Sequence, residues 1–351
     1  MRWVALLAAL SCLLLGSCSG SHEAGKPVVT VYMYSEYVYP ELPKEFEQRT
    51  GMSCNIDVYE ATEEMLAKLQ QAGGTSQYDV VVMSDHAISV AAKLGLIQPL
   101  DKARIPNAVH VSDQFKSPPF DPEQKYSLPY QWGTVGLMYN KEQLPNLAPT
   151  WDVIFQETGQ TGTFVLMDSM RDMLGIALKY KGFSANSRKP EELRLAGEGV
   201  LAAKKSPRSL GFEGGVGGKN RVVAGTAAMA IVYNGDAVRA IGENDKLAFL
   251  LPREGAIIWV DCMTVPSQAP NLEGAHKFFD FILDPDVGAK LSNFNRYATP
   301  NTASLPAIAE QDRNNRAIYP SEQDLSKLEY LQDLGNDTRL YDEVWTAVKS
   351  R

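Results

Sequence analysis

The stretch VVTVYMYSEY at residues 28–37 decides the fold of this chain. Its first seven residues are mostly apolar or β-branched and predict a buried strand over residues 28–34. Residues 40–50 follow it with helical periodicity and are stopped by Gly51, a residue that often ends helices. A buried strand that runs into a helix is the repeating unit of open α/β sheets. The sequence therefore predicts an α/β protein.

The same alternation continues along the chain. A helix over residues 63–71, a strand over 79–83 and a helix capped by Ser84 or Asp85 complete a first βαβ-type unit that ends near Gly95. The remaining predicted strands cover residues 134–139, 163–167, 227–233, 248–251 and 262–265. The remaining predicted helices cover residues 168 or 169 to 180, 191–205, 272–283 and 341–349. The chain length favours two domains or lobes.

Acidic residues stand beside aromatic ones at the ends of three apolar runs. These segments are Tyr34-Ser35-Glu36-Tyr37, Tyr233-Asn234-Gly235-Asp236 and Trp259-Val260-Asp261. An aromatic ring attracts a cation through its quadrupole, and a desolvated carboxylate attracts it by charge. Several such pairs in one cleft would form a cage for an organic ammonium group. We therefore interpret the chain as an amine-binding receptor.

The candidate residues share one position in the predicted sheet. Residues 34–37, 84–86, 168–172, 233–236 and 259–261 all follow predicted strands. Ligands of open α/β sheets bind at the carboxyl ends of strands, so we expect these segments to meet. Residues two apart in a strand point to one side, which would place Trp259 and Asp261 together.

Each acid also has a purely structural interpretation. Asp261 could cap a turn beside a core Trp259, Asp236 could cap the helix that follows it, and Glu36 could be a solvated loop acid. Few arginines lie near these acids in the sequence, which favours the ligand interpretation. The exception is Arg171, which could pair with an acid such as Asp172.

The glycine-rich segment at residues 211–220 does not fit a phosphate-binding loop. Glu213 takes the place of the first required glycine, and Asn220 follows Lys219 where Ser or Thr is needed. No predicted strand precedes the segment, so we expect a flexible loop. The sequence shows no nucleophile elbow and no Cys–His arrangement, and we expect neither catalytic residues nor a cofactor.

The N-terminus predicts export. Arg2 precedes a short apolar stretch over residues 4–15, and Leu15-Gly16-Ser17-Cys18 closes it as in a bacterial lipoprotein signal. This resemblance implies a signal peptide at residues 1–17, lipidation of Cys18 and a linker over residues 18–27. An ordinary secretory signal is the alternative.

Composition narrows the partners. The formal net charge of −8 argues against nucleic acid and suits a cationic ligand. The four histidines show no metal-ligand spacing, and no metal site is expected. Cys54 and Cys262 remain in the exported chain; export permits a disulfide, although separate buried thiols are the commoner outcome.

Four segments together resemble a known family. They are Asp79-Val80-Val81-Val82-Met83-Ser84, Tyr126-Ser127-Leu128-Pro129-Tyr130-Gln131-Trp132-Gly133, Trp259-Val260-Asp261 and Tyr297-Ala298-Thr299-Pro300-Asn301. In this order and spacing they resemble the spermidine/putrescine-binding proteins of bacterial ABC importers, from about residue 28 to the C-terminus.

The resemblance implies a type II periplasmic-binding-protein fold. Two α/β lobes, residues 28–133 with 260–304 and residues 134–259 with 305–351, would close over a polyamine in a hinge motion. The implied partners are putrescine or spermidine and a membrane permease with its ATPase. A periplasmic monomer anchored to the membrane through Cys18 is expected.

The family's binding positions carry over residue by residue. The resemblance implies ligand-binding roles for Tyr34, Ser35, Glu36, Tyr37, Ser84, His86, Asp172, Tyr233, Asp236, Trp259, Asp261 and Tyr297. Tyr34 and Tyr233 stand where tryptophan is common, and Asp172 stands where glutamate is usual.

Three departures from the family pattern concern ligand preference. Ser169 replaces an aspartate of the spermidine binders, and Leu331, beside Gln332, replaces a glutamine. Asp236 matches an acid of putrescine-specific members. These changes predict that putrescine binds at least as well as spermidine.

Two other function classes fit parts of the pattern. Aromatic residues with paired carboxylates also describe a carbohydrate-binding or glycoside-hydrolysing lipoprotein, which would need one acid of raised pKa and amide donors for hydroxyl groups. A surface adhesin without a small ligand is the other alternative.

Overall fold

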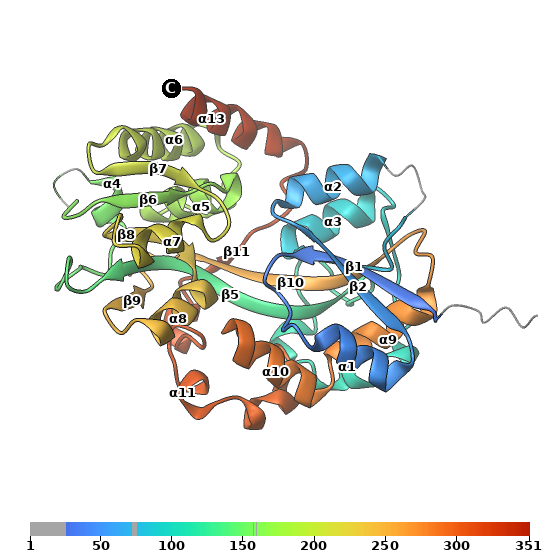
Figure 1. Cartoon of the computed structure of the whole chain (residues 1–351). Coiled ribbons are helices and arrows are strands. Elements are labelled where there is room, and N and C mark those ends of the chain that lie inside the picture. Colours follow the sequence, from blue (N-terminus) through green and yellow to red (C-terminus); the bar gives the residue numbers. More distant parts are fainter. Residues whose placement is uncertain (1–25, 72–75, 157, 159) are drawn as a thin grey trace, which may run out of the picture.

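The computed structural model describes residues 26–351 except 72–75, 157 and 159. The predicted signal peptide and Cys18 lie outside the described residues. Two α/β halves lie side by side, and strands β5 and β10 run from one half into the other (Figure 1). The fold is the predicted two-lobed α/β architecture.

The strands of the described residues form one curled sheet in the order β2-β1-β3-β10-β5-β8-β6-β7, with β4 and β11 beside β10 and β9 beside β5. Their bounds are β1 (Val28–Tyr34), β2 (Ser53–Tyr59), β3 (Val80–Ser84), β4 (Ile97–Gln98), β5 (Ser127–Asn140), β6 (Phe164–Met167), β7 (Ser209–Glu213), β8 (Met229–Tyr233), β9 (Leu247–Leu250), β10 (Ile257–Pro266) and β11 (Glu329–Tyr330).

Helices cover the sheet in both halves (Figure 1). The α-helices are α1 (Leu42–Thr50), α2 (Thr62–Gln71), α3 (Asp85–Lys93), α4 (Asp152–Phe155), α5 (Met170–Tyr180), α6 (Pro190–Lys205), α7 (Gly217–Val223), α8 (Asn234–Glu243), α9 (Leu272–Ile282), α10 (Pro285–Asn295), α11 (Glu310–Arg313), α12 (Glu322–Leu325) and α13 (Thr338–Ser350). Short 3-10 helices are η1 (Lys102–Arg104), η2 (Pro106–His110), η3 (Asp113–Phe115), η5 (Thr302–Ala307) and η6 (Gly335–Asp337).

Parallel pairing brings strand ends together in each half. Strand β1 pairs in parallel with β2 and β3, and β6 pairs in parallel with β7 and β8. Helices α3, α5 and α8 begin within three residues of the ends of β3, β6 and β8. Parallel strands end at one edge of the sheet, so the segments that follow them are close in space.

The two crossing strands are longer than the sequence predicts. Residues 127–134 of β5 pair with β10, whereas residues 135–140 pair with β8 and β9. The prediction had only residues 134–139 and 262–265 as strands, because Pro129 and Gly133 interrupt the first run and Asp261 the second. The predicted lobe boundaries at residues 133 and 259 fall inside these two continuous strands.

The sequence also missed both edge strands. The glycine-rich segment at residues 211–220 is not a loop alone, since its first residues belong to β7 and helix α7 begins at Gly217. Strand β2 was not predicted either. Both lie at the ends of the sheet path and are partly exposed, so their side chains lack the apolar pattern that marks a buried strand.

The predicted amphipathic helix is confirmed as α9. Ala275, Phe278, Phe279 and Ile282 are all buried in the main hydrophobic core. Cys54 and Cys262 are separate free thiols, and burial raises the pKa of Cys54 to about 12. The thiol of Cys54 is therefore protonated at neutral pH and poorly reactive.

Candidate functional site

A cavity of about 400 Å³ lies between the two halves of the molecule. All twelve ligand-binding residues predicted from the sequence line it: Tyr34, Ser35, Glu36, Tyr37, Ser84, His86, Asp172, Tyr233, Asp236, Trp259, Asp261 and Tyr297. Ser169 and Leu331 line it as well, whereas Gln332 is not among the lining residues. The fold brings the five predicted segments together around this cavity, as expected.

Asp261 is one of the buried acids that line this cavity. It lies inside β10 and not at a strand end, and the pairing of β10 with β5 shifts register just after it. Its carboxylate accepts hydrogen bonds from the Tyr37 hydroxyl at 2.5 Å and the Ser84 hydroxyl at 2.9 Å. Burial raises the pKa of Asp261 to about 7. The turn-capping interpretation is wrong.

No basic side chain of the described residues lies within ion-pairing distance of Asp261. Ser84 stands at the N-cap position of α3, yet its side chain makes no cap hydrogen bond and instead donates to Asp261. Two hydroxyl groups thus orient this carboxylate without neutralising its charge. A buried, unneutralised carboxylate is the kind of group that gains most from a bound cation.

Asp172 has the same kind of environment in the other half. It lies in the first turn of α5 and accepts hydrogen bonds from the Ser169 hydroxyl at 2.7 Å and the Tyr233 hydroxyl at 3.0 Å. Burial raises the pKa of this carboxyl as well. Among the described residues it has no ion-pair partner.

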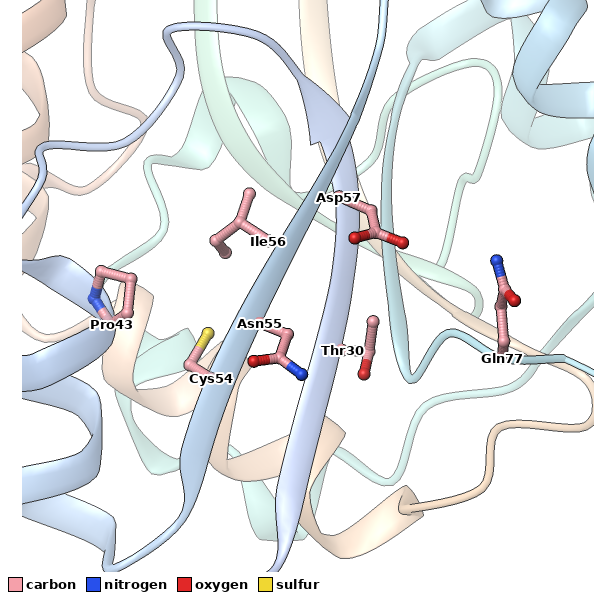
Figure 2. A pocket seen from close by; sticks show the side chains of 7 residues that line it. All are labelled: Thr30, Pro43, Cys54, Asn55, Ile56, Asp57 and Gln77. Carbon is pink, nitrogen blue, oxygen red and sulfur yellow. The ribbon is translucent and has the colours of Figure 1, made fainter.

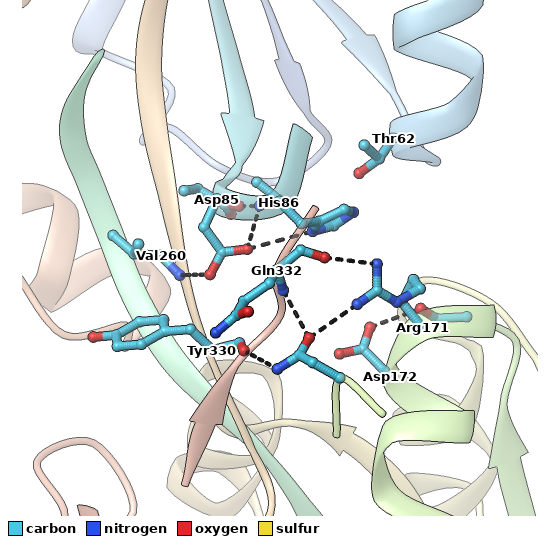
Figure 3. Close-up of polar contacts among 12 residues, drawn as sticks. Thr62, Asp85, His86, Arg171, Asp172, Val260, Tyr330 and Gln332 are labelled. Carbon is cyan, nitrogen blue, oxygen red and sulfur yellow. Dashed lines mark hydrogen bonds and ion pairs between the residues drawn. The ribbon is translucent and has the colours of Figure 1, made fainter. Parts of the chain in front are cut away.

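Arg171 does not neutralise Asp172, which resolves an alternative that the sequence left open. Its guanidinium donates to the Gln332 carbonyl oxygen at 3.0 Å and to Asn186 Oδ1 at 3.1 Å (Figure 3). It also lies 5.0 Å from the centre of the Tyr341 ring. Arg171 therefore ties α5 to the C-terminal segment.

A row of aromatic rings joins the two acids. Ring centres lie 5.9 Å apart for Tyr37 and Tyr297, 5.0 Å for Tyr297 and Trp259, and 5.9 Å for Trp259 and Tyr233. Tyr34 continues the row, 5.9 Å from Tyr37. Such rings pack against methylene groups and attract cations over their faces.

Two glycines make this close packing possible. A Cβ atom on Gly133 would lie 2.5 Å from the Trp259 ring, and one on Gly235 would lie 2.4 Å from the Tyr297 ring. Any larger residue would displace these rings. The glycine in Asn234-Gly235 thus serves the aromatic wall as well as the start of α8.

Asp236 differs from Asp261 and Asp172 because it has a cationic partner. Arg239 lies 2.6 Å from Asp236 within α8 and 2.9 Å from Glu36 in the other half. The expectation that few arginines lie near the acids is therefore wrong at this position. Asp236 is not the N-cap of α8, since Tyr233 holds that position. Glu36 adopts a left-handed backbone conformation with φ of 56°, unusual for a residue other than glycine.

Several residues that line the cavity were not predicted from the sequence as ligand-binding residues. Asp85 is buried, accepts from the backbone N–H groups of His86 and Val260, and lies 3.3 Å from the His86 ring (Figure 3). Asp342 and Trp345 reach it from α13. No local signal marks the α13 residues, but Arg239 follows Asp236 by three positions, the spacing of helix neighbours.

A second hollow of about 580 Å³ is an open groove on the outer edge of the sheet, beside β2 (Figure 2). Its lining residues are Thr30, Pro43, Cys54, Asn55, Ile56, Asp57 and Gln77. It has one acid and no aromatic ring. The chemistry of an amine cage is therefore present only in the cavity between the halves, as far as the described residues show.

The family model and the relatives that match this chain are all described as solute-binding proteins. Residues 41–317 match the family model described as bacterial extracellular solute-binding protein. The chain is 31% identical to the spermidine/putrescine-binding periplasmic protein of Salmonella typhimurium over 99% of both chains. It is 32% identical to the putrescine-binding periplasmic protein SpuD of Pseudomonas aeruginosa over 97% of both.

Solved structures agree with these relatives. The TpPotD lipoprotein of Treponema pallidum has a TM-score of 0.82 with this chain at 26% identity, covering 92% of this chain and 100% of its own. None of the helices within the described residues has the length and apolarity needed to cross a membrane.

Proposed function

This chain belongs to the bacterial extracellular solute-binding protein family, and we propose that it binds putrescine or spermidine and delivers it to an ABC importer. The observation that carries this proposal is the pair of buried acids, Asp261 and Asp172, whose polar partners are hydroxyl groups alone. An aromatic row lies beside them in the same cavity. Carbohydrate binding or hydrolysis finds no support among the relatives, which are polyamine-binding proteins by name.

Each acid would take one ammonium group of the ligand. An ammonium donates three hydrogen bonds and has no acceptor, which matches carboxylates that already accept from hydroxyl donors. The rings of Tyr37, Trp259 and Tyr297 would pack on the methylene chain between the ammonium groups. Each cation–π contact adds about 2 kcal/mol when water is excluded. We assign no catalytic step to any of these residues.

Closure of the two halves would exclude that water. Tyr37 and Asp261 belong to the half built on β1, whereas Asp172 and Tyr233 belong to the half built on β6 and β8. A ligand that contacts both halves binds the closed arrangement more tightly and shifts the population toward it. The permease with its ATPase would recognise that closed form.

Two residues of the cavity bear on the choice between putrescine and spermidine. Ser169 and Leu331 line the cavity at positions where spermidine binders place an aspartate and a glutamine. Both changes remove contacts for a longer amine, so putrescine is expected to bind at least as well as spermidine. Asp236 does not add to this preference, because its carboxylate is already paired with Arg239.

We place the protein in the periplasm as a monomer anchored through a lipid on Cys18. The motif Leu15-Gly16-Ser17-Cys18 supports the anchor, and one structural neighbour is named a lipoprotein. Metabolic labelling with a palmitate analogue tests it: the intact chain is expected to be labelled, and Cys18→Ala to lose the label.

Calorimetric titration of the purified chain tests the proposed ligand. Putrescine and spermidine are expected to bind and to raise the melting temperature, since a ligand that binds only the folded state stabilises it. Glucose and maltose serve as neutral controls and are expected to do neither. Absence of heat with both amines would reject the proposal.

A further inference from the structure

A further buried acid of the cavity, Asp236, already forms an ion pair with a cationic side chain of the protein, Arg239. Asp236 is buried beside Tyr297, and the Arg239 guanidinium lies 2.6 Å from its Oδ1. The same NH2 group of Arg239 lies 2.9 Å from Glu36. Arg239 thus neutralises two acids that otherwise face the cavity from its two sides.

The guanidinium depends on these two carboxylates for its position. Its Nε atom is buried and has no hydrogen-bond partner among the described residues. Burial acts to lower the pKa of Arg239, but the charge of Asp236 outweighs it and the net pKa is raised. The side chain therefore stays protonated inside the cavity wall as a fixed positive charge.

We infer that Arg239 is a specificity-determining residue that favours dications such as putrescine over trications such as spermidine. This inference rests on the proposed polyamine function and deepens it. Two buried acids whose polar partners are hydroxyl groups alone, Asp261 and Asp172, match two ammonium groups. The third ammonium of spermidine needs a third acid, because a buried charge is costly unless it is paired.

The remaining acids of the cavity are not available to pair with a third ammonium group. Asp168 is paired with Lys349 at 2.7 Å, and Asp85 lies against His86. Glu60, Glu63 and Asp342 are exposed, where water screens their charge. Asp85 and Asp236 are the other buried acids among the lining residues described. Asp85 accepts hydrogen bonds from the backbone N–H groups of His86 and Val260, whereas Arg239 pairs with Asp236 and repels a nearby ammonium.

An alternative role for Arg239 is a latch between the halves, because it joins Asp236 to Glu36 across the cavity. The two roles predict different results. A latch stabilises the closed form for every ligand, so its loss weakens putrescine and spermidine equally. A specificity residue changes the ratio of their dissociation constants.

The test is Arg239→Met, which keeps the aliphatic stem and removes the charge. We expect the ratio of the spermidine Kd to the putrescine Kd to fall at least tenfold relative to the unmodified chain, measured by calorimetry at low salt. Arg194→Met is the matched control, since Arg194 pairs with Glu191 and Glu198 on the exposed face of α6. It should leave the ratio within twofold.

A second variant isolates the acid that the change frees. In Arg239→Met/Asp236→Asn the third acid is removed again, so the spermidine gain should disappear. If Arg239→Met does not fold, Arg239→Gln takes its place with the same expectation. An unchanged ratio in the folded variant, or a gain that survives Asp236→Asn, would overturn the inference. Failure of the unmodified chain to bind either amine would instead reject the proposed function.

Discussion

Two acids of one cavity, Asp261 and Asp236, are buried to the same extent and have opposite environments. Each residue is 6% exposed. Asp261 accepts hydrogen bonds from Tyr37 and Ser84 and has no cationic partner among the described residues. Asp236 forms an ion pair with Arg239. Burial alone therefore does not make an acid a ligand site; the charge of its partner decides.

The difference shows how a receptor can be ready for a cation without holding one. Hydroxyl groups orient the Asp261 carboxylate but carry no positive charge to compensate for its burial. Burial therefore raises the pKa of Asp261 to about 7. Arg239 supplies that charge to Asp236 permanently.

The largest effect is expected at Asp261. Asp261→Asn should weaken putrescine binding by about 2–5 kcal/mol, because it leaves a buried ammonium without its counter-charge. Calorimetric titration measures the loss. The unliganded variant should melt at no lower temperature than the unmodified chain at pH 8, since a buried unpaired charge has been removed. Retained amine affinity in this variant would remove Asp261 from the site.

Asp172→Asn should have the next largest effect. We expect a loss of about 1.5–3 kcal/mol, the range for one hydrogen bond to a charged group, because Ser169 and Tyr233 still line the same end of the cavity. Tyr180→Phe, a change on the same helix away from the cavity, serves as the control and should bind normally. Equal affinity of Asp172→Asn and the control would assign the second ammonium elsewhere.

The contrast also predicts a dependence on pH. Ligand binding needs ionised Asp261, whose pKa without ligand is about 7. Below that pH the carboxyl must first lose a proton, so the putrescine Kd should rise up to tenfold per pH unit, or about 1.4 kcal/mol. Above pH 8 it should be constant.

Titrations between pH 5 and pH 9 measure this slope. Asp261→Asn is the informative comparison, because its residual binding should lack the inflection near pH 7. An equally steep slope in that variant would assign the titrating group to another residue, such as Asp172, whose pKa is also raised by burial.

The same pKa predicts a trend in stability without ligand. The folded-state pKa lies above the ordinary value of an aspartate, so the folded chain binds the extra proton between about pH 4 and pH 7. This contribution to stability is fully present below about pH 4 and is lost as the pH rises through 7. Denaturant unfolding of the unmodified chain and Asp261→Asn should therefore differ least at low pH and most at pH 8.

The smallest effect is expected at Glu36. Its side chain is 52% exposed, so its ion pair with Arg239 is screened by water. Glu36→Gln should change amine affinity by less than about 1 kcal/mol. A loss as large as that of Asp261→Asn would show that Glu36 itself holds a ligand ammonium.

Buried strands were predicted from the sequence, whereas the partly exposed strands at the two ends of the sheet were missed. Strand β1 was predicted with its observed bounds and β3 to within one residue, because their side chains are buried and apolar. The edge strands β2 and β7 were missed, because one side of each meets solvent and tolerates polar residues. The crossing strands were cut short at Gly133 and Asp261, where the site itself replaces ordinary strand residues.

The sequence by itself identified twelve of the side chains that line the cavity. Aromatic and acidic residues at strand ends are a local pattern, and parallel strands bring such ends together in any open α/β sheet. Only the tertiary structure decided which acids remain unneutralised. Arg239 is three residues from Asp236 but 203 from Glu36, and Asp261 is 224 from Tyr37. Electrostatic pairing depends on distance in space, which packing of the two halves fixes and sequence separation does not.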